Sequence, residues 1–163
     1  MNIKNAIEEA KKDKRIKEIL NHGGFLTTGF TTLSPKEKIE KWNLSFYDPE
    51  TEKITSITVS ESSKEIGLTD SPIHKKIYKP DELKIKISAD DALKKAKEEY
   101  KKYNAPLSKI LISFQKREKE FWNITFITKI GHLINVQIDA ESGEIMKSEE
   151  TNIFQVEKKT AAS

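Results

Sequence analysis

The sequence of 163 residues contains no cysteine, which excludes disulfide bonds, thiolate metal sites and a cysteine nucleophile. It also lacks a long apolar run. No stretch approaches the roughly 7 to 15 apolar residues of a signal peptide or the roughly 18 of a membrane span. Because a charged amphipathic helix follows directly on the first residues, we expect a cytoplasmic protein without a membrane segment.

A surplus of charge of one sign is missing as well. The 29 basic and 26 acidic side chains leave a net charge of only +3, and Lys alternates with Glu throughout the chain. Binding of nucleic acid through its phosphates requires a one-sided cluster of Lys and Arg, so a nucleic-acid partner is not favoured. The apolar residues, 36% of the chain, fall in periodic groups, which indicates a folded protein.

An internal repeat is the strongest pattern in the sequence. Residues 42–47 (WNLSFY) match residues 122–127 (WNITFI) at an offset of 80, and segments 53–59 and 132–138 continue the match with a slip of one residue. Each copy begins with a predicted helix that carries two alanines four residues apart: Ala6 and Ala10, then Ala92 and Ala96. Duplication explains this order most simply. It predicts an α+β fold of two repeated modules, each a helix packed on a three- to four-stranded antiparallel sheet.

The second copy, residues 85–150, has readily predicted elements. Leu83, Ile85 and Ile87 alternate with lysines, which indicates a strand with one buried face. Ser88 is expected to cap the following helix, with Asp91 three residues later. Strands are predicted at 110–114, 121–127 and 133–138, with a short last strand at 144–148 and a C-terminal tail at 151–163.

The first copy, residues 1–70, is less regular. Its helix should bend or restart near Asp13, where the apolar face changes direction, and residues 22–24 with two glycines should end it. Strands are predicted at 25–33, 41–47 and 53–60. Residues 71–84 are predicted to be a linker or edge strand. The extra edge strand would span 73–78. The linker itself would span 67–72 and so overlap the end of the first copy.

The second copy resembles the PepSY family. Residues 87–96 (ISADDALKKA) are similar to the start of that module, and residues 136–145 (VQIDAESGEI) to its terminal V-x-V-D-A-x-T-G-x-V pattern. The resemblance covers residues 85–149 and extends more weakly to 3–66. It implies a cystatin-like helix and sheet, and a role in restraining peptidases or in sensing outside the cytoplasm. The first copy departs from the pattern, with Ser63 in the place of Gly143.

Motifs for catalysis or metal binding are absent from the sequence. The three histidines, His22, His74 and His132, do not share the spacing of ligands on one element, and each is expected to be structural. Residues 139–143 are typical of a turn rather than a cation loop. Residues 24–29 begin like a phosphate loop but lack its Lys-Ser/Thr, so a strand is predicted. We therefore expect no enzyme, no metal and no cofactor.

The two tryptophans, Trp42 and Trp122, are expected to fill the core between helix and sheet. Alternation places other apolar side chains on the opposite face of the sheet. The possible partner-binding residues are Tyr47, Phe121, Ile127, Lys116 and Arg117. The sequence thus favours a non-enzymatic binding or regulatory protein with a protein or peptide partner, including a peptidase-inhibitor-like role. The alternatives are a small-molecule carrier or sensor, or a binder of single-stranded nucleic acid in which Lys109, Lys116 and Arg117 cluster beside exposed rings.

Overall fold

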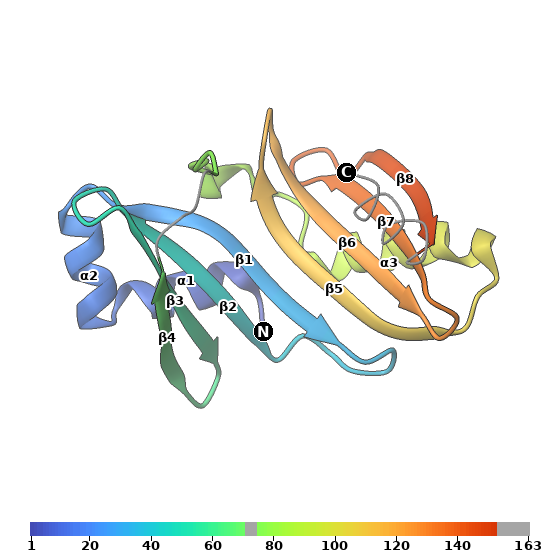
Figure 1. Cartoon of the computed structure of the whole chain (residues 1–163), viewed down its shortest axis with the longest axis horizontal. Helices are drawn as coiled ribbons and strands as arrows, with labels where there is room; N and C mark the ends of the chain where they lie inside the picture. Colours follow the sequence, from blue (N-terminus) through green and yellow to red (C-terminus); the bar gives the residue numbers. More distant parts are fainter. Residues whose placement is uncertain (71–74, 153–163) are drawn as a thin grey trace, which may run out of the picture.

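The computed structural model describes residues 1–70 and 75–152, and within these residues one eight-stranded antiparallel sheet carries the helices (Figure 1). The first half contains α1 (Ile3–Lys11), α2 (Lys14–Asn21), β1 (Phe25–Leu33), β2 (Lys41–Asp48), β3 (Lys53–Ser60) and β4 (Lys64–Asp70). The 3-10 helix η1 (Glu82–Lys84) precedes the second half, which contains α3 (Ala89–Tyr100), the 3-10 helix η2 (Lys101–Tyr103), β5 (Leu107–Lys116), β6 (Glu120–Thr128), β7 (His132–Asp139) and β8 (Ile145–Asn152).

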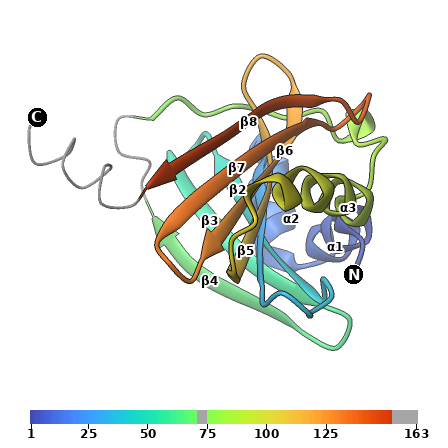
Figure 2. The same ribbon diagram turned by 90° about the vertical axis from the view of Figure 1, so that its right-hand side faces the viewer.

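The two halves join edge to edge through their first strands. The strand order is β4-β3-β2-β1-β5-β6-β7-β8, and β1 pairs antiparallel with β5 from Gly29 opposite Phe114 to Leu33 opposite Ile110. Each half therefore contributes four strands in consecutive hairpins together with its own helices. Figure 2 shows the helices of both halves on the same side of the sheet. The predicted α+β fold, with a helix packed on an antiparallel sheet in each half, is confirmed.

The cap of α3 at Ser88 and the break of the first helix near Asp13 lie where the sequence predicts. The side chains of Asn2 and Ser88 cap α1 and α3 by accepting hydrogen bonds from the backbone N–H of Lys4 and Asp91. Asp13 ends α1 and caps α2, because its carboxylate accepts from Arg15 N at 2.9 Å. This interruption turns the apolar face of the first helix, so that both α1 and α2 bury isoleucines against the sheet.

The tryptophans meet in the middle of the core. Their ring centroids lie 5.9 Å apart, and both side chains are completely buried. Trp42 Nε1 donates to Met1 O and Trp122 Nε1 donates to Ile87 O, and each acceptor directly precedes the N-cap residue of the helix in its own half. Each indole thus ties a strand to the start of a helix while burying a large apolar surface.

Three predictions around the connection of the halves are wrong. Residues 83–87 form no strand, since Lys86 N and Ile87 N both donate to Ala140 O instead of joining a ladder, and Leu83 is 83% exposed. Residues 67–70 belong to β4 rather than to a linker, because they pair with the free edge of β3. Of the proposed strand at 73–78, residues 75–78 are irregular and the remainder lies outside the described residues.

The last strand is longer than the sequence predicts. β8 runs to Asn152, so the first two residues of the predicted tail pair with β7, while residues 153–163 lie outside the described part. In residues 1–70 and 75–152, no helix has the length and apolar character needed to cross a bilayer.

Candidate partner-binding site

The sheet has a face opposite the helices, here called the back face. Alternation along the strands places polar side chains there, and they form a hydrogen-bonded ladder across neighbouring strands. Asn43 Nδ2 donates to Thr58 Oγ1 at 3.2 Å in the first half, and Asn135 Nδ2 donates to Asn123 Oδ1 at 2.8 Å and to Thr125 Oγ1 at 3.0 Å in the second. The back face is therefore a polar platform, unlike the apolar face that packs on the helices.

The segment of residues 75–81 is anchored to the start of β6 at the junction of the halves. Asp81 N donates to Glu120 Oε1 at 3.0 Å, and Lys116 Nζ lies 3.3 Å from the same oxygen. Burial raises the pKa of Glu120, but the bond from Asp81 N and the interaction with Lys116 outweigh it and lower the pKa overall. A carboxylate that is 2% exposed thus stays ionised and holds both the segment and the strand end.

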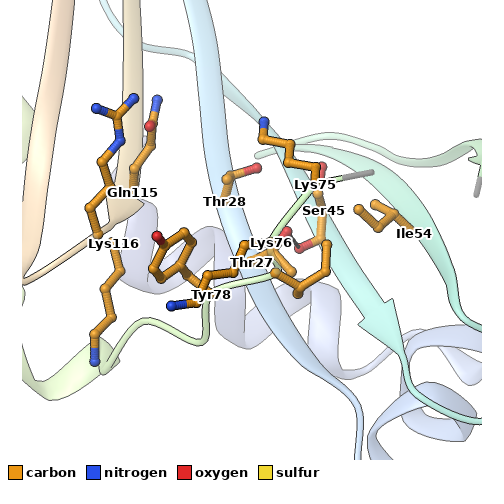
Figure 3. A pocket seen from close by; sticks show the side chains of 11 residues that line it. Thr27, Thr28, Ser45, Ile54, Lys75, Lys76, Tyr78, Gln115 and Lys116 are labelled. Carbon is orange, nitrogen blue, oxygen red and sulfur yellow. Dashed lines mark hydrogen bonds between the residues drawn. The ribbon is translucent and has the colours of Figure 1, made fainter. Parts of the chain in front are cut away.

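A pocket of about 310 Å³ lies where this segment faces β1, β2 and β5; it is called the junction pocket below. Four cationic side chains line it, two from the segment and two from the end of β5: Lys75, Lys76, Lys116 and Arg117. Figure 3 shows Tyr78 between Lys116 on one side and Thr28 on the other. None of the described residues that line the pocket is acidic, so its lining carries a net positive charge.

Neutral polar groups complete the pocket wall. Thr27, Thr28 and Ser45 contribute hydroxyls, and Gln115 contributes an amide that donates to Ser113 Oγ at 2.6 Å. The hydroxyl of Thr27 donates to Ser45 O at 3.1 Å across the irregular pairing of β1 and β2. Cations beside hydroxyl and amide groups suit a carboxylate or another small anion, because charge-assisted hydrogen bonds are stronger than neutral ones.

The structure brings two of the five predicted partner-binding residues into the junction pocket. These are Lys116 and Arg117. Phe121 lines an adjoining hollow of about 430 Å³ that shares Tyr78 and Arg117, and its side chain is only 2% exposed.

Tyr47 and Ile127 lie elsewhere on the back face. Tyr47 is half-buried against Phe25, with ring centroids 5.6 Å apart, and Ile127 is half-buried between its neighbours on β5 and β7. Sequence reasoning missed Lys75, Lys76 and Tyr78. The signal was present as the basic and aromatic run 75–79, but the sequence alone did not show that this run returns to the sheet.

The remaining candidates do not line the junction pocket. Residues 139–143 form the predicted turn, since Asp139 Oδ1 accepts from Glu141 N and Ser142 N. The predicted strand at 25–33 is β1. His132 Nδ1 pairs with Glu150, His22 Nδ1 lies near Asp48 and Glu50, and His74 lies outside the described residues.

The fold and the pocket define an α+β protein of two halves with a cationic hollow at their junction. Residues 86–149, in the second half, match the family model of the peptidase propeptide and YPEB domain, PepSY. The crystal structure of a "putative lipoprotein" from Clostridium difficile 630 is similar in fold, with a TM-score of 0.58, 14% sequence identity and coverage of 93% of either chain. No curated protein matches the chain in sequence.

Proposed function

We propose that the protein is a non-enzymatic binding or regulatory protein that holds an anionic segment of a protein or peptide partner in the junction pocket. The observation that carries this proposal is the set of three cations, besides the Lys116 that pairs with Glu120, without an acidic residue among the described lining residues. Such a one-sided charge attracts acidic side chains or a chain-terminal carboxylate and raises the association rate.

The position of the pocket supports a polypeptide ligand. It lies beside strand ends of both halves, and the adjoining hollow shares Lys76, Tyr78 and Arg117 with it, so an extended segment can cross both hollows. The match of residues 86–149 to a domain described as a peptidase propeptide supports an inhibitor-like role within this proposal. We further propose that the first half is a diverged copy of the same module, because its tryptophan bonds to the equivalent carbonyl before a helix cap.

A fluorescein-labelled, glutamate-rich peptide with a free C-terminal carboxylate tests the proposal. The double variant Lys76→Gln/Arg117→Gln should weaken its binding, followed by fluorescence anisotropy, by more than about tenfold, since two charge-assisted contacts are lost. The matched control, Lys4→Gln/Lys94→Gln, removes two exposed cations on the helices and should leave affinity unchanged. Equal weakening by both double variants, or no binding to the native chain, would overturn the proposal.

The alternatives predict different results in the same assays. The pocket volume of about 310 Å³ also admits a small dicarboxylate, and a thermal shift with metabolites but no peptide binding would favour a carrier. The single-strand hypothesis is weakened, because Lys109 lines another hollow, beside Phe30, rather than the junction pocket. The cytoplasmic location stays part of the proposal, and fractionation of cells that express a tagged chain tests it.

A further inference from the structure

Three potential metal ligands converge at the end of α2, away from the junction pocket. His22 Nδ1 lies 3.0 Å from Asp48 Oδ2 and 2.9 Å from Glu50 Oε2, and one ligand atom from each residue falls within 4.8 Å of the others. In residues 1–70 and 75–152, this trio alone brings three such donors so close together. His22 is the C-cap residue of α2, Asp48 is the last residue of β2, and Glu50 lies in the turn between β2 and β3.

The backbone orients two of these donors before any ligand arrives. Asp48 Oδ1 accepts from Glu50 N at 2.9 Å, which leaves Oδ2 facing the imidazole. His22 N donates to Glu18 O at the end of α2, which fixes the imidazole at that helix terminus. Outer hydrogen bonds of this kind hold metal ligands in place and are worth about 10- to 100-fold in affinity.

The charge around the trio favours a cation. Two carboxylates face the imidazole, Glu18 adds a third nearby negative charge, and the C-terminal carbonyls of α2 point the same way. The hydrogen bond with Asp48 raises the pKa of His22, although burial opposes the rise.

The donor set and its dimensions select the class of metal. One imidazole nitrogen and two carboxylate oxygens suit zinc and similar borderline divalent ions, whereas calcium requires six to eight oxygens. Bonds of about 2.0–2.2 Å in a tetrahedral site place ligand atoms roughly 3.4 Å apart. The observed separations of 3.0 Å and 2.9 Å must each open by roughly 0.4 to 0.5 Å. The exposed Glu50 side chain supplies one opening, and a small rotation of the partly exposed His22 ring supplies the other.

We propose that His22, Asp48 and Glu50 form a site for zinc or a similar divalent transition-metal ion, with water in the remaining coordination positions. The ion links the end of α2 to the β2–β3 turn, so binding stabilises the first half of the protein. Access is open, since His22 has 29% of its side chain exposed next to the exposed Glu50.

Isothermal calorimetry with zinc chloride and the full chain, at about pH 8, tests the site. The native chain should bind one zinc ion, and His22→Gln and Glu50→Gln should each weaken binding by more than about tenfold. His132→Gln is the matched control, because His132 pairs with the single carboxylate of Glu150; it should leave binding unchanged.

Visible absorption of bound Co²⁺ provides a second, independent measurement of the same site. Replacement of zinc by Co²⁺ should give the intense visible absorption of a four-coordinate site in the native chain and in His132→Gln, and none in His22→Gln. Far-ultraviolet circular dichroism of each variant checks that it is folded. A native chain that binds no zinc, or a folded His22→Gln variant that binds zinc as tightly as the native chain, would overturn the proposal. The trio would then be only an ion pair between His22 and two carboxylates.

Discussion

The two halves share a plan but differ in how the third and fourth strands connect and in what holds the start of the helix. In the second half, the turn after β7 does both tasks. Asp139 Oδ1 accepts from Glu141 N at 2.8 Å and from Ser142 N at 3.1 Å, while Ala140 O accepts from Lys86 N and Ile87 N. This turn therefore clamps the segment that enters α3.

The first half separates these tasks. Its turn after β3 is a tight connection in which Ser60 Oγ accepts from Ser63 N at 3.1 Å and Ser60 N donates to Ser63 O at 2.9 Å. The start of α1 is held elsewhere, by the hydrogen bond from the N-terminal amine to Ile39 O. The D-A-x-x-G pattern of residues 139–143 is thus a device for anchoring a helix, and the first half does without it. This difference explains physically why the pattern is clear in only one half.

The largest expected loss of stability comes from substituting the buried tryptophans that the two halves have in common. Trp42→Ala and Trp122→Ala should each lower the free energy of unfolding by about 3–5 kcal/mol, because both rings are completely buried. Trp42→Phe and Trp122→Phe keep most of the packing and lose one hydrogen bond each, at about 1–3 kcal/mol. Urea unfolding measures both pairs.

The phenylalanine pair also tests the equivalence of the halves. Since the rings are in contact, the cost of the double variant should differ from the sum of the single costs. Single costs that differ by more than about 2 kcal/mol would contradict the view that both indoles play the same role.

A smaller expected loss of stability at low pH comes from Asp139 in the turn of the second half. Burial opposes ionisation of Asp139, but the bonds from Lys119, Ser142 N and Glu141 N prevail and lower its pKa to about 2. Because the folded pKa lies below the ordinary value of 3.8, the stabilisation is present above about pH 4 and is lost as the pH falls towards 2. The native chain should lose about 1–2 kcal/mol over this window in urea unfolding.

Asp139→Asn supplies the comparison for that pH series. The amide retains the oxygen that accepts from the turn but carries no charge, so the variant should be less stable at neutral pH and should lack this part of the acid-induced loss. Glu141→Gln, an exposed neighbour on the same turn, is the control and should behave like the native chain. An identical acid profile for native chain and Asp139→Asn would show that Asp139 does not set it.

The smallest expected change in stability comes from exchanging the turn residues of the two halves. Gly143 has a φ of +77°, and an added Cβ would lie 3.3 Å from Ile87, so Gly143→Ala should cost about 1–2 kcal/mol. Ser63→Gly, the reverse change, should cost less than about 1 kcal/mol, because Ser63 is exposed and has no positive φ. Thermal unfolding of both variants measures this; a larger cost for Ser63→Gly would contradict the proposed difference.

Much of the fold could be predicted from local patterns. The alternation around Trp42 and Trp122 identified strands and their buried faces, and Ser88 before a helical period marked the start of α3, because these signals act within a few residues. The interruption at Asp13 was predictable for the same reason. The strand predicted at 83–87 was wrong, because Ala140, more than fifty residues away, captures its backbone donors.

The candidate sites depended on the tertiary structure far more than the strands did. Lys116 and Arg117 were recognisable as a basic pair, but only the pairing of β1 with β5 and the bond from Asp81 N to Glu120 bring Lys75 and Lys76 beside them. Likewise, 26 residues separate His22 from Asp48, and no spacing rule for ligands on one element joins them.

The sequence by itself determined two modules of helix and antiparallel sheet, the tryptophan core and the turn at 139–143, since periodicity and turn chemistry are local properties. The tertiary structure alone decided that the two sheets become one through β1 and β5, that Phe121 is covered, and that cations gather at the junction. The physical reason is that pairing of strand edges and burial by a distant segment are determined by the free energy of the whole chain, which no short window of sequence contains.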